Sequence, residues 1–380
     1  MARLIGDLRP VHVVGIGMHP YQRVTDAPYV TLGLTAIRAA LVDAGVAWEQ
    51  VESTYVGSAL LGAAPGRPML RHLGALGGPF VHVENASATG SAAVRLAAIE
   101  VASGISDVAL VVGVDKPDAA RMRRSETGVP SLADDAVVPW THFALLAQQY
   151  ADRFGVAPDD FAHVAVKNHA NGALNPFAQR QKTRTLDEVL GGPRLAGSVT
   201  PLQATSVGEG AAAVVIVSED AIRDLGLDAG RAVRIASSAA SSERAAQSID
   251  PDTVMSAETI NRAMREAQTA TADLDVVEFH EAFTVEEALY AEAAGLCAPG
   301  TYLSRVVDGE FDIGGRTAIS ASGGLIAMGH PGGPTGIGQI VEIVRQLRGE
   351  AGARQHAGAS TGLAHMVGVG AVCYVHVLRS

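Results

Sequence analysis

Three residues with side chains able to carry nucleophilic or acid–base chemistry lie far apart in the sequence, each where the chain is expected to turn. The first, Ser87, follows a strand-like run at 80–83 and precedes a helical pattern that begins near residue 91. A helix N-terminus presents unpaired N–H groups and a positive dipole end, which stabilise developing negative charge. Small residues at 86, 88 and 90 allow close approach of a substrate. The pattern is typical of a nucleophile, although serine is also a common helix N-cap.

The other two residues are histidines in the second half of the chain. His280 ends an apolar strand in Val-Val-Glu-Phe-His-Glu-Ala-Phe, and His330 lies in the glycine-rich run 322–336. A histidine at a strand end is usually structural. Beside a hydroxyl group, however, His330 can act as a general base, and His280 can donate to an oxyanion. The backbone N–H groups of a turn expected at 365–370 are candidates for a second oxyanion hole.

Buried-strand patterns alternate with helical patterns along the chain. Strands are expected at 11–17, around 55–56 and at 108–112 and 210–217, with a helix at 30–45 and another after Ser87. Such alternation indicates βαβ units in a mixed or parallel α/β sheet. Gly15-x-Gly17 lacks the third glycine of a dinucleotide fingerprint, so a Rossmann site is rejected.

The second half of the chain repeats the first. Residues 40–59 align without gaps on 263–282, the strand at 233–236 corresponds to 13–16, and the helix at 336–347 corresponds to the helix after Ser87. The chain therefore reads as a duplicated α/β domain. A site between the two halves is the default expectation, and there Ser87, His280 and His330 would meet.

The predicted domain organisation is a first half at 1–118, completed by 205–229, an inserted loop domain at 119–204, and a second half at 230–380. The insertion has a helix at 142–154 and another after residue 160, and long insertions often form lids or binding loops. It carries nine basic and eight acidic residues, hence +1, whereas the rest of the chain carries −12. The insertion is therefore where phosphate groups are expected, and its basic residues are Arg121, Arg123, Arg124, Arg153, Lys167, Arg180, Lys182, Arg184 and Arg194.

Composition excludes several classes of protein. The net charge of −11 argues against a nucleic-acid partner, because phosphate contacts need clustered Lys and Arg. No charge-free apolar run is long enough for a membrane span, and the first residues lack a signal-peptide core. Cys297 and Cys373 form neither a metal-ligand spacing nor a disulfide framework. We therefore expect no metal site, and we expect a cytoplasmic location, where thiols stay reduced.

Four blocks of the sequence resemble the thiolase superfamily, in particular the sterol-carrier-protein-type thiolases and thiolase-like lipid-transfer proteins. They are Val-Glu-Asn-Ala-Ser87-Ala-Thr-Gly-Ser-Ala-Ala, His280-Glu-Ala-Phe, Ser-Gly-Gly-Leu-Ile-Ala-Met-Gly-His330-Pro and Gly368-Val-Gly-Ala-Val-Cys-Tyr-Val. The resemblance covers essentially the whole chain. It implies the thiolase fold, in which duplicated βαβαβ halves form a five-layered α-β-α-β-α core with an inserted loop domain.

The resemblance also implies chemistry on coenzyme A thioesters through an acyl-enzyme, with no tightly bound cofactor. Position 87 would be the nucleophile, His330 would activate it, and His280 would hold the thioester oxygen. The family usually forms dimers, often paired into tetramers, and its insertion contacts much of the coenzyme A. By the same resemblance, the oxyanion-hole candidates beyond residue 87 are Met366 and Gly368, and the substrate-binding candidates are Phe283, Ser322, Gly323 and Met328.

Two departures from the family pattern bear on the reaction. The family nucleophile is cysteine, whereas this chain has Ser87, and the acid–base cysteine of thiolases corresponds here to Ala282 or Ala364. Cys373 lies in an alternating strand and is expected in the core. A serine hydroxyl needs a well-placed base throughout the reaction, unlike a thiol that is partly ionised near neutral pH. The sequence leaves open whether serine at 87 is natural or an engineered replacement.

Three functions stay open on these residues. The first is acyl transfer, or specialised carbon–carbon bond chemistry, on a coenzyme A thioester, and the retention of both histidines favours it. The second is a retro-aldol lyase acting on an acyl-CoA, with a small OB-fold partner subunit as in some relatives. The third is a non-catalytic acyl-CoA-binding subunit.

Overall fold

The computed structural model describes residues 4–118, 138–244, 250–368 and 372–380, and its strands form one sheet of two similar halves. The first half contains β1 (Val11–Gln22), β2 (Ser53–Gly57), β3 (Phe80–Val83), β4 (Val108–Asp115) and β5 (Glu209–Ser218). The second half contains β6 (Val233–Ser242), β7 (Val276–Glu278), β8 (Ala318–Ile319), β9 (Thr361–Gly368) and β10 (Val372–Arg379).

Strand order shows the duplication directly. The order across the sheet is β3-β2-β4-β5-β1 followed by β6-β10-β9-β7-β8, so the second half repeats the first in reverse order, with each strand number raised by five. In each half the second strand is parallel to its two neighbours and the other pairs are antiparallel. The two halves meet where β1 pairs antiparallel with β6, with His12 opposite Arg234 and Val13 opposite Val233. The duplication predicted from the sequence is confirmed.

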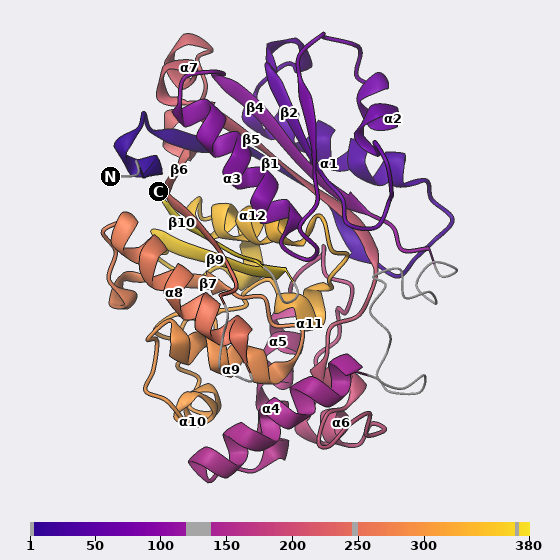
Figure 1. The fold of residues 1–380 in the computed structure, drawn as a ribbon, viewed down its shortest axis with the longest axis vertical. Helices are drawn as coiled ribbons and strands as arrows, with labels where there is room; N and C mark the ends of the chain where they lie inside the picture. Colours follow the sequence, from indigo (N-terminus) through magenta and orange to yellow (C-terminus); the bar gives the residue numbers. More distant parts are fainter. Residues whose placement is uncertain (1–3, 119–137, 245–249, 369–371) are drawn as a thin grey trace.

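Helices cover the half-sheets in layers (Figure 1). The outer face of the first half carries α1 (Tyr29–Ala44), α2 (Gly66–Arg71) and α7 (Glu219–Asp224). Between the two halves lie α3 (Thr89–Ala102) and α12 (Thr335–Leu347), which contact each other and both half-sheets. The outer face of the second half carries α8 (Pro251–Glu266) and α9 (Thr284–Ala293). These layers give the expected α-β-α-β-α core.

Alternation along β5 shows how one strand serves two layers. Ala213 and Val215 pack with α1, whereas Val214 and Ile216 pack with α3 and α12. The glycines of β1 have a packing role, because a Cβ on Gly15 would lie 2.2 Å from the carbonyl oxygen of Ala40 in α1. Gly15-x-Gly17 therefore serves close helix–strand contact.

The middle of the chain contributes helices that pack on the second half. They are α4 (Val138–Phe154), α5 (Ala162–Ala173) and α6 (Leu186–Leu190). α5 contacts α9, α10 (Tyr302–Val307) and the short α11 (Gly324–Met328). The two helices predicted here are confirmed, whereas the boundaries of the inserted domain stay a prediction. The remaining helical elements are 3-10 turns at Ile5–Asp7, Trp48–Gln50, Pro158–Phe161, Pro201–Gln203, Ala229–Arg231, Thr271–Asp273 and Gly352–Arg354.

One prediction was wrong near the end of the chain. Residues 365–368, which were expected in a turn, continue β9 and pair with β10, with Gly368 opposite Val372. The glycines at 368 and 370 suggested a turn, but every residue of 361–368 is buried and the cross-strand pairing outweighs local turn preference. Residues 369 and 370 lie outside the described residues.

Two expected absences concern membranes and metals. Within the described ranges, no helix has the length and apolar character needed to cross a bilayer. The same part of the chain holds no group of His, Cys, Asp and Glu side chains arranged for a metal ion. Cys297 and Cys373 are both free and buried, and Cys373 belongs to the core as predicted.

Candidate active site

Ser87 and His330 meet although 243 positions separate them in the sequence. Ser87 Oγ lies 2.9 Å from His330 Nε2, and His330 Nδ1 lies 2.8 Å from Thr335 Oγ1. Ser87 comes from the turn between β3 and α3, His330 from the loop between α11 and α12, and Thr335 is the first residue of α12. The two predicted residues thus lie together between the halves, within reach for proton transfer.

The turn that presents Ser87 is tight and tied to the start of α3. Ala86 has φ +49°, a left-handed conformation that costs a non-glycine residue about 1–2 kcal/mol. Thr89 holds this turn, because its hydroxyl donates to the Ala86 carbonyl at 2.7 Å and accepts from the Asn85 N–H at 2.8 Å. Ser87 is therefore fixed two residues before the positive end of α3.

The loop that carries His330 is held by backbone contacts and a buried carboxylate. The Gly333 N–H donates to Asp115 Oδ2 at 2.6 Å, and a Cβ on Gly113 would lie 2.6 Å from Pro334 Cα. Asp115 also accepts from the Ser58 hydroxyl at 2.7 Å. This acid at the end of β4 was missed in the sequence, where only its place after a buried strand could have indicated it.

His330 is an unusually weak base. Burial lowers the pKa of His330 to about 4, so the imidazole is neutral at physiological pH. Its ring partners among the described residues are the hydroxyls of Ser87 and Thr335, and neither is a carboxylate. When Nε2 accepts the Ser87 proton, Nδ1–H must donate to Thr335, so no negative charge stabilises the resulting imidazolium.

His280 completes the cluster with an unsatisfied ring. Its residue is 5% exposed, and its ring centroid lies 5.4 Å from that of His330, edge to face. Neither ring nitrogen has a hydrogen-bond partner within the described residues, and burial lowers the pKa of His280 well below its usual value. Buried polar atoms without a partner are rare, and at this position a ligand oxygen would supply one.

A second histidine supports the backbone of His280. The His280 N–H donates to His365 Nδ1 at 3.4 Å, and His365 Nε2 lies 2.8 Å from the Ser256 hydroxyl on α8. Burial lowers the pKa of His365 to about 3, so this ring is neutral. Because Nδ1 accepts, Nε2 must carry the proton and donate to Ser256. The sequence placed His365 in a turn and missed this contact.

The oxyanion-hole candidates lie on β9. A Cβ on Gly368 would lie 2.4 Å from the Asn85 carbonyl oxygen, so the end of β9 touches the turn of Ser87. The Asn85 side chain also donates to the Tyr374 hydroxyl of β10 at 3.2 Å. Met366 lies opposite Tyr374 in the β9–β10 pairing. The roles of Met366 and Gly368 in holding an oxyanion stay predictions.

Of the substrate-binding candidates, Phe283 lies beside the helices of the middle segment. Its ring stacks on Phe143 of α4 with centroids 4.3 Å apart and meets Trp140 edge to face at 5.1 Å. Phe283 directly precedes α9 and follows His280 by three residues. It therefore joins the aromatic side of α4 to the strand end that carries His280.

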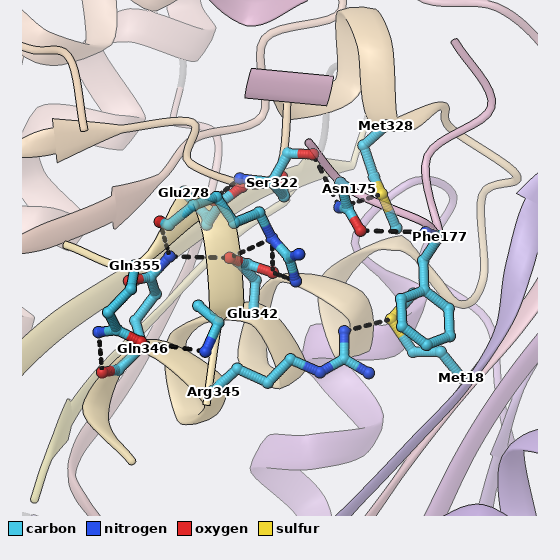
Figure 2. A network of polar contacts seen from close by, with 12 residues as sticks. Met18, Asn175, Phe177, Glu278, Ser322, Met328, Glu342, Arg345, Gln346 and Gln355 are labelled. Atoms are coloured by element: carbon cyan, nitrogen blue, oxygen red, sulfur yellow. Dashed lines mark hydrogen bonds and ion pairs between the residues drawn. The ribbon is translucent and has the colours of Figure 1, made fainter. Parts of the chain in front are cut away.

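The other three substrate-binding candidates have partners inside the protein, and Figure 2 shows those of Ser322 and Met328. The Ser322 hydroxyl and N–H donate to Glu278 at 2.6 and 2.9 Å, and burial raises the pKa of Glu278 to about 8. The Met328 sulfur accepts from the Asn175 amide at 3.2 Å. Gly323, with φ +104°, packs against the backbone of α5. Substrate contact by Ser322, Gly323 and Met328 stays a prediction.

Comparison with known proteins settles the family. Residues 11–186 match the family described as Thiolase, N-terminal domain, and residues 237–379 match Thiolase C-terminal domain-like. The chain belongs to the thiolase family. It is 32% identical to sterol carrier protein 2 of Gallus gallus over 97% of this chain and 71% of that protein. It is 31% identical to the benzoylsuccinyl-CoA thiolase subunit BbsB of Thauera aromatica, with 90% of each chain covered.

Solved structures agree with this thiolase fold. The Ltp2-ChsH2(DUF35) aldolase superposes with a TM-score of 0.81 at 21% identity, covering 98% of each chain. Human mitochondrial 3-ketoacyl-CoA thiolase superposes with a TM-score of 0.75 at 20% identity, covering 100% of each chain. At such low identity these likenesses establish the thiolase fold and leave the reaction to be argued from the site.

No cysteine of this thiolase-family chain is suited to the missing acid–base role. Ala282 and Ala364 occupy the positions discussed above, and Ala364 is buried in β9. Burial raises the pKa of the Cys297 thiol to about 11 and that of the Cys373 thiol to about 12. Both thiols are therefore protonated at neutral pH.

Proposed function

We propose that this chain is a thiolase-like enzyme that acts on a coenzyme A thioester by acyl transfer or by forming or breaking a carbon–carbon bond. Ser87 is the nucleophile, His330 is the base and His280 donates to the thioester oxygen. The observation that carries the proposal is the 2.9 Å contact of Ser87 Oγ with His330 Nε2. The unpartnered ring of His280 beside this pair supports it.

The acyl-enzyme route follows from these positions. His330 Nε2 takes the Ser87 proton while Oγ attacks the thioester carbon, and the carbonyl oxygen becomes an oxyanion. That oxyanion receives a hydrogen bond from His280 and lies near the positive end of α3. The carbonyl then re-forms, the coenzyme A thiolate leaves with the proton from His330, and the acyl group stays on Ser87. An oxygen, nitrogen or carbon acceptor then takes the acyl group.

A retro-aldol reaction is the second candidate, and the neutral, unpartnered ring of His280 fits it. A neutral imidazole is an effective hydrogen-bond donor to a developing oxyanion. In this route His330 takes the proton of a β-hydroxyacyl-CoA hydroxyl, the hydroxyl carbon becomes the carbonyl of a leaving aldehyde or ketone as the Cα–Cβ bond breaks, and the electrons of that bond form a thioester enolate. The proton on His330 then passes to the enolate carbon. His280 donates to the enolate oxygen, and Ser87 forms no covalent bond. An aldolase among the matching folds is consistent with this route.

The partners proposed for this chain are an acyl-CoA substrate and a second copy of itself, in a dimer or a pair of dimers. β3 is the outermost strand of its half, and Phe80 and Val81 on it are exposed. An exposed apolar edge strand favours pairing with another chain. For the lyase, we propose a small OB-fold partner subunit, because the Ltp2-ChsH2(DUF35) aldolase is named with a second component. We also propose a cytoplasmic location.

Intact-protein mass after incubation with a panel of acyl-CoAs tests the proposal, with Ser87→Ala as the matched variant. A gain of one acyl group that disappears in Ser87→Ala would establish the acyl-enzyme. Free aldehyde or ketone released from β-hydroxyacyl-CoAs, without a protein adduct, would establish the lyase. Binding of acyl-CoA with neither result would leave the non-catalytic subunit as the function.

A further inference from the structure

A buried carboxyl group faces His280 from the first turn of α9. Glu286 Oε1 lies 3.9 Å from His280 Nδ1, and the Glu286 side chain is 3% exposed. Glu286 Oε2 accepts from the Phe283 N–H at 2.8 Å, and Oε1 accepts from the Tyr290 hydroxyl at 3.0 Å. Neither donor is a cation, so no described hydrogen bond supplies a positive charge to balance an ionised Glu286.

The surroundings favour the neutral form of both groups. Burial raises the pKa of Glu286 well above its usual value, and nearby acids on α8 act in the same direction. Burial lowers the pKa of His280, so the pair is an acid beside a neutral ring. The titratable groups that face Glu286 from the packed elements are His280 after β7, Tyr290 on α9, His365 on β9 beside the Tyr290 ring, and Asp250 and Asp252 at the start of α8.

The hydrogen bonds locate the acid proton. Oε2 receives the Phe283 N–H, and Oε1, which faces His280 Nδ1, accepts from the Tyr290 hydroxyl through one lone pair. A proton on Oε1 is compatible with both contacts and is the one that can reach Nδ1. A carboxyl O–H directed at Nδ1 requires a lone pair on that nitrogen. A neutral imidazole with a lone pair on Nδ1 carries its hydrogen on Nε2.

We propose that Glu286, as a neutral carboxylic acid, fixes the tautomer of His280 so that Nε2–H faces the Ser87–His330 site and donates to the thioester oxygen. This inference rests on the proposed function. Glu286 is a positioning residue, because it acts only through His280. An ionised Glu286 would instead accept Nδ1–H, and the lone pair left on Nε2 would repel an oxyanion.

The distance of 3.9 Å is about 1 Å longer than a hydrogen bond. Catalytic contacts are often long without substrate and shorten in the complex. A thioester oxygen bound at Nε2 makes Nδ1 more basic and strengthens the contact with Glu286. We therefore expect the pair to tighten when an acyl-CoA binds.

Nitrogen NMR of the full chain labelled with ¹⁵N-histidine tests the tautomer directly, with the His280 signals assigned from His280→Gln. The wild type is expected to carry its proton on Nε2. Glu286→Gln is expected to keep the His280 proton on Nε2, because the amide donates to Nδ1 in place of the acid. In Glu286→Leu, both His280 tautomers are expected to be populated. Glu292→Gln is the matched control, since Glu292 lies on the same helix but bonds Tyr150 and Gly300.

An Nδ1–H tautomer in the wild type, or a tautomer unchanged in Glu286→Leu, would overturn the inference. For an acyl-CoA that is turned over, Glu286→Leu should lower kcat about 100-fold with little change in KM, because an oxyanion donor is lost. Glu286→Gln should keep the rate, because the amide also donates to Nδ1. An unresponsive tautomer in an enzyme still acylated at Ser87 would refute this inference alone. The expected tautomer without acyl-CoA chemistry would refute the proposed function alone.

Discussion

A serine at position 87 depends on its base more heavily than a cysteine does. Among the described residues, the ring of His330 hydrogen-bonds only hydroxyl groups, and burial lowers its pKa to about 4, so it gives that serine little help. A thiol in the same place would be partly ionised near neutral pH without such a base. For the proposed acyl transfer, we therefore expect the rate to be limited by how readily Ser87 loses its proton.

Ser87→Cys should form the acyl-enzyme faster. We expect an increase of at least about tenfold in the acylation rate, because a thiolate is intrinsically the stronger nucleophile. A time course of intact mass with a fixed acyl-CoA measures it, and the double variant Ser87→Cys/His330→Asn reports how much His330 still contributes. Acylation no faster than in the wild type would mean that nucleophile strength does not limit this site.

Acylation should be insensitive to pH across the neutral range. The reaction needs neutral His330, so its rate should rise as pH increases through about 4 and stay level above about 5. An unshifted histidine would place this rise near pH 6.5. Initial rates of acyl-Ser87 formation between pH 4 and 8 check this, provided that circular dichroism shows a folded protein throughout. If the acylation rate reached half its maximum near pH 6.5, burial would not have lowered the pKa of His330.

Site residues whose side chains are themselves reactive could be predicted from the sequence. Residues whose role depends on contacts in the folded chain could not. Ser87, His280 and His330 could be named because hydroxyl and imidazole groups lay at expected turns, and the internal repeat predicted that they meet. Asp115 and Glu286 could not, because nothing local tells a buried acid from a solvated one. The hydrogen-bond partners of Asp115 lie in other elements. Glu286 is buried because α8 and β9 cover it, and no local sequence pattern indicates that.

Among the elements, the loop from Gly329 to Pro334 sets the position of His330. It lies on glycines of the first half, since a Cβ on Gly90 would be 2.6 Å from the Gly333 carbonyl oxygen and one on Gly113 would be 2.6 Å from Pro334 Cα. Repetition at 40–59 and 263–282 predicted β2 and β7 correctly. The prediction of a turn from the glycines near the end of the chain was wrong at 365–368, where pairing with β10 decides the conformation.

Gly113→Ala should displace this loop and lower activity more than a typical glycine change. The added methyl group meets backbone rather than a movable side chain, so we expect about 1–3 kcal/mol of lost stability and a longer Ser87–His330 contact. Urea unfolding and the acylation rate measure the two effects. Gly192→Ala is the control, because its Cβ would meet nothing closer than 3.5 Å. If both variants had the same stability and the same acylation rate, the loop would be able to move aside without affecting either the fold or the site.

At the scale of the whole molecule, the edge strand β3 is the clearest place for a second chain. Val81 is 43% exposed on this strand, so a charge there costs the monomer little but opposes pairing of two apolar edges. Val81→Lys should convert a dimer to a monomer in light scattering at micromolar concentration. Val42→Lys on α1, where Val42 is 83% exposed, is the control. A dimer retained in Val81→Lys would place the interface elsewhere.

The two halves of the sheet, alike in strand order, have not kept equal shares of the site. The first supplies Ser87, and the second supplies His280 and His330. If the halves arose by duplication of one ancestral unit, the two copies have since taken different parts of the site. The sequence of each copy is then constrained by the other. A side chain added at Gly90 would meet Gly333 and Ile337 of the other copy, and one added at Gly113 would meet Gly333 and Pro334, so we expect compensating changes there. Descendants of this gene should therefore vary together across the repeat boundary more than within either copy.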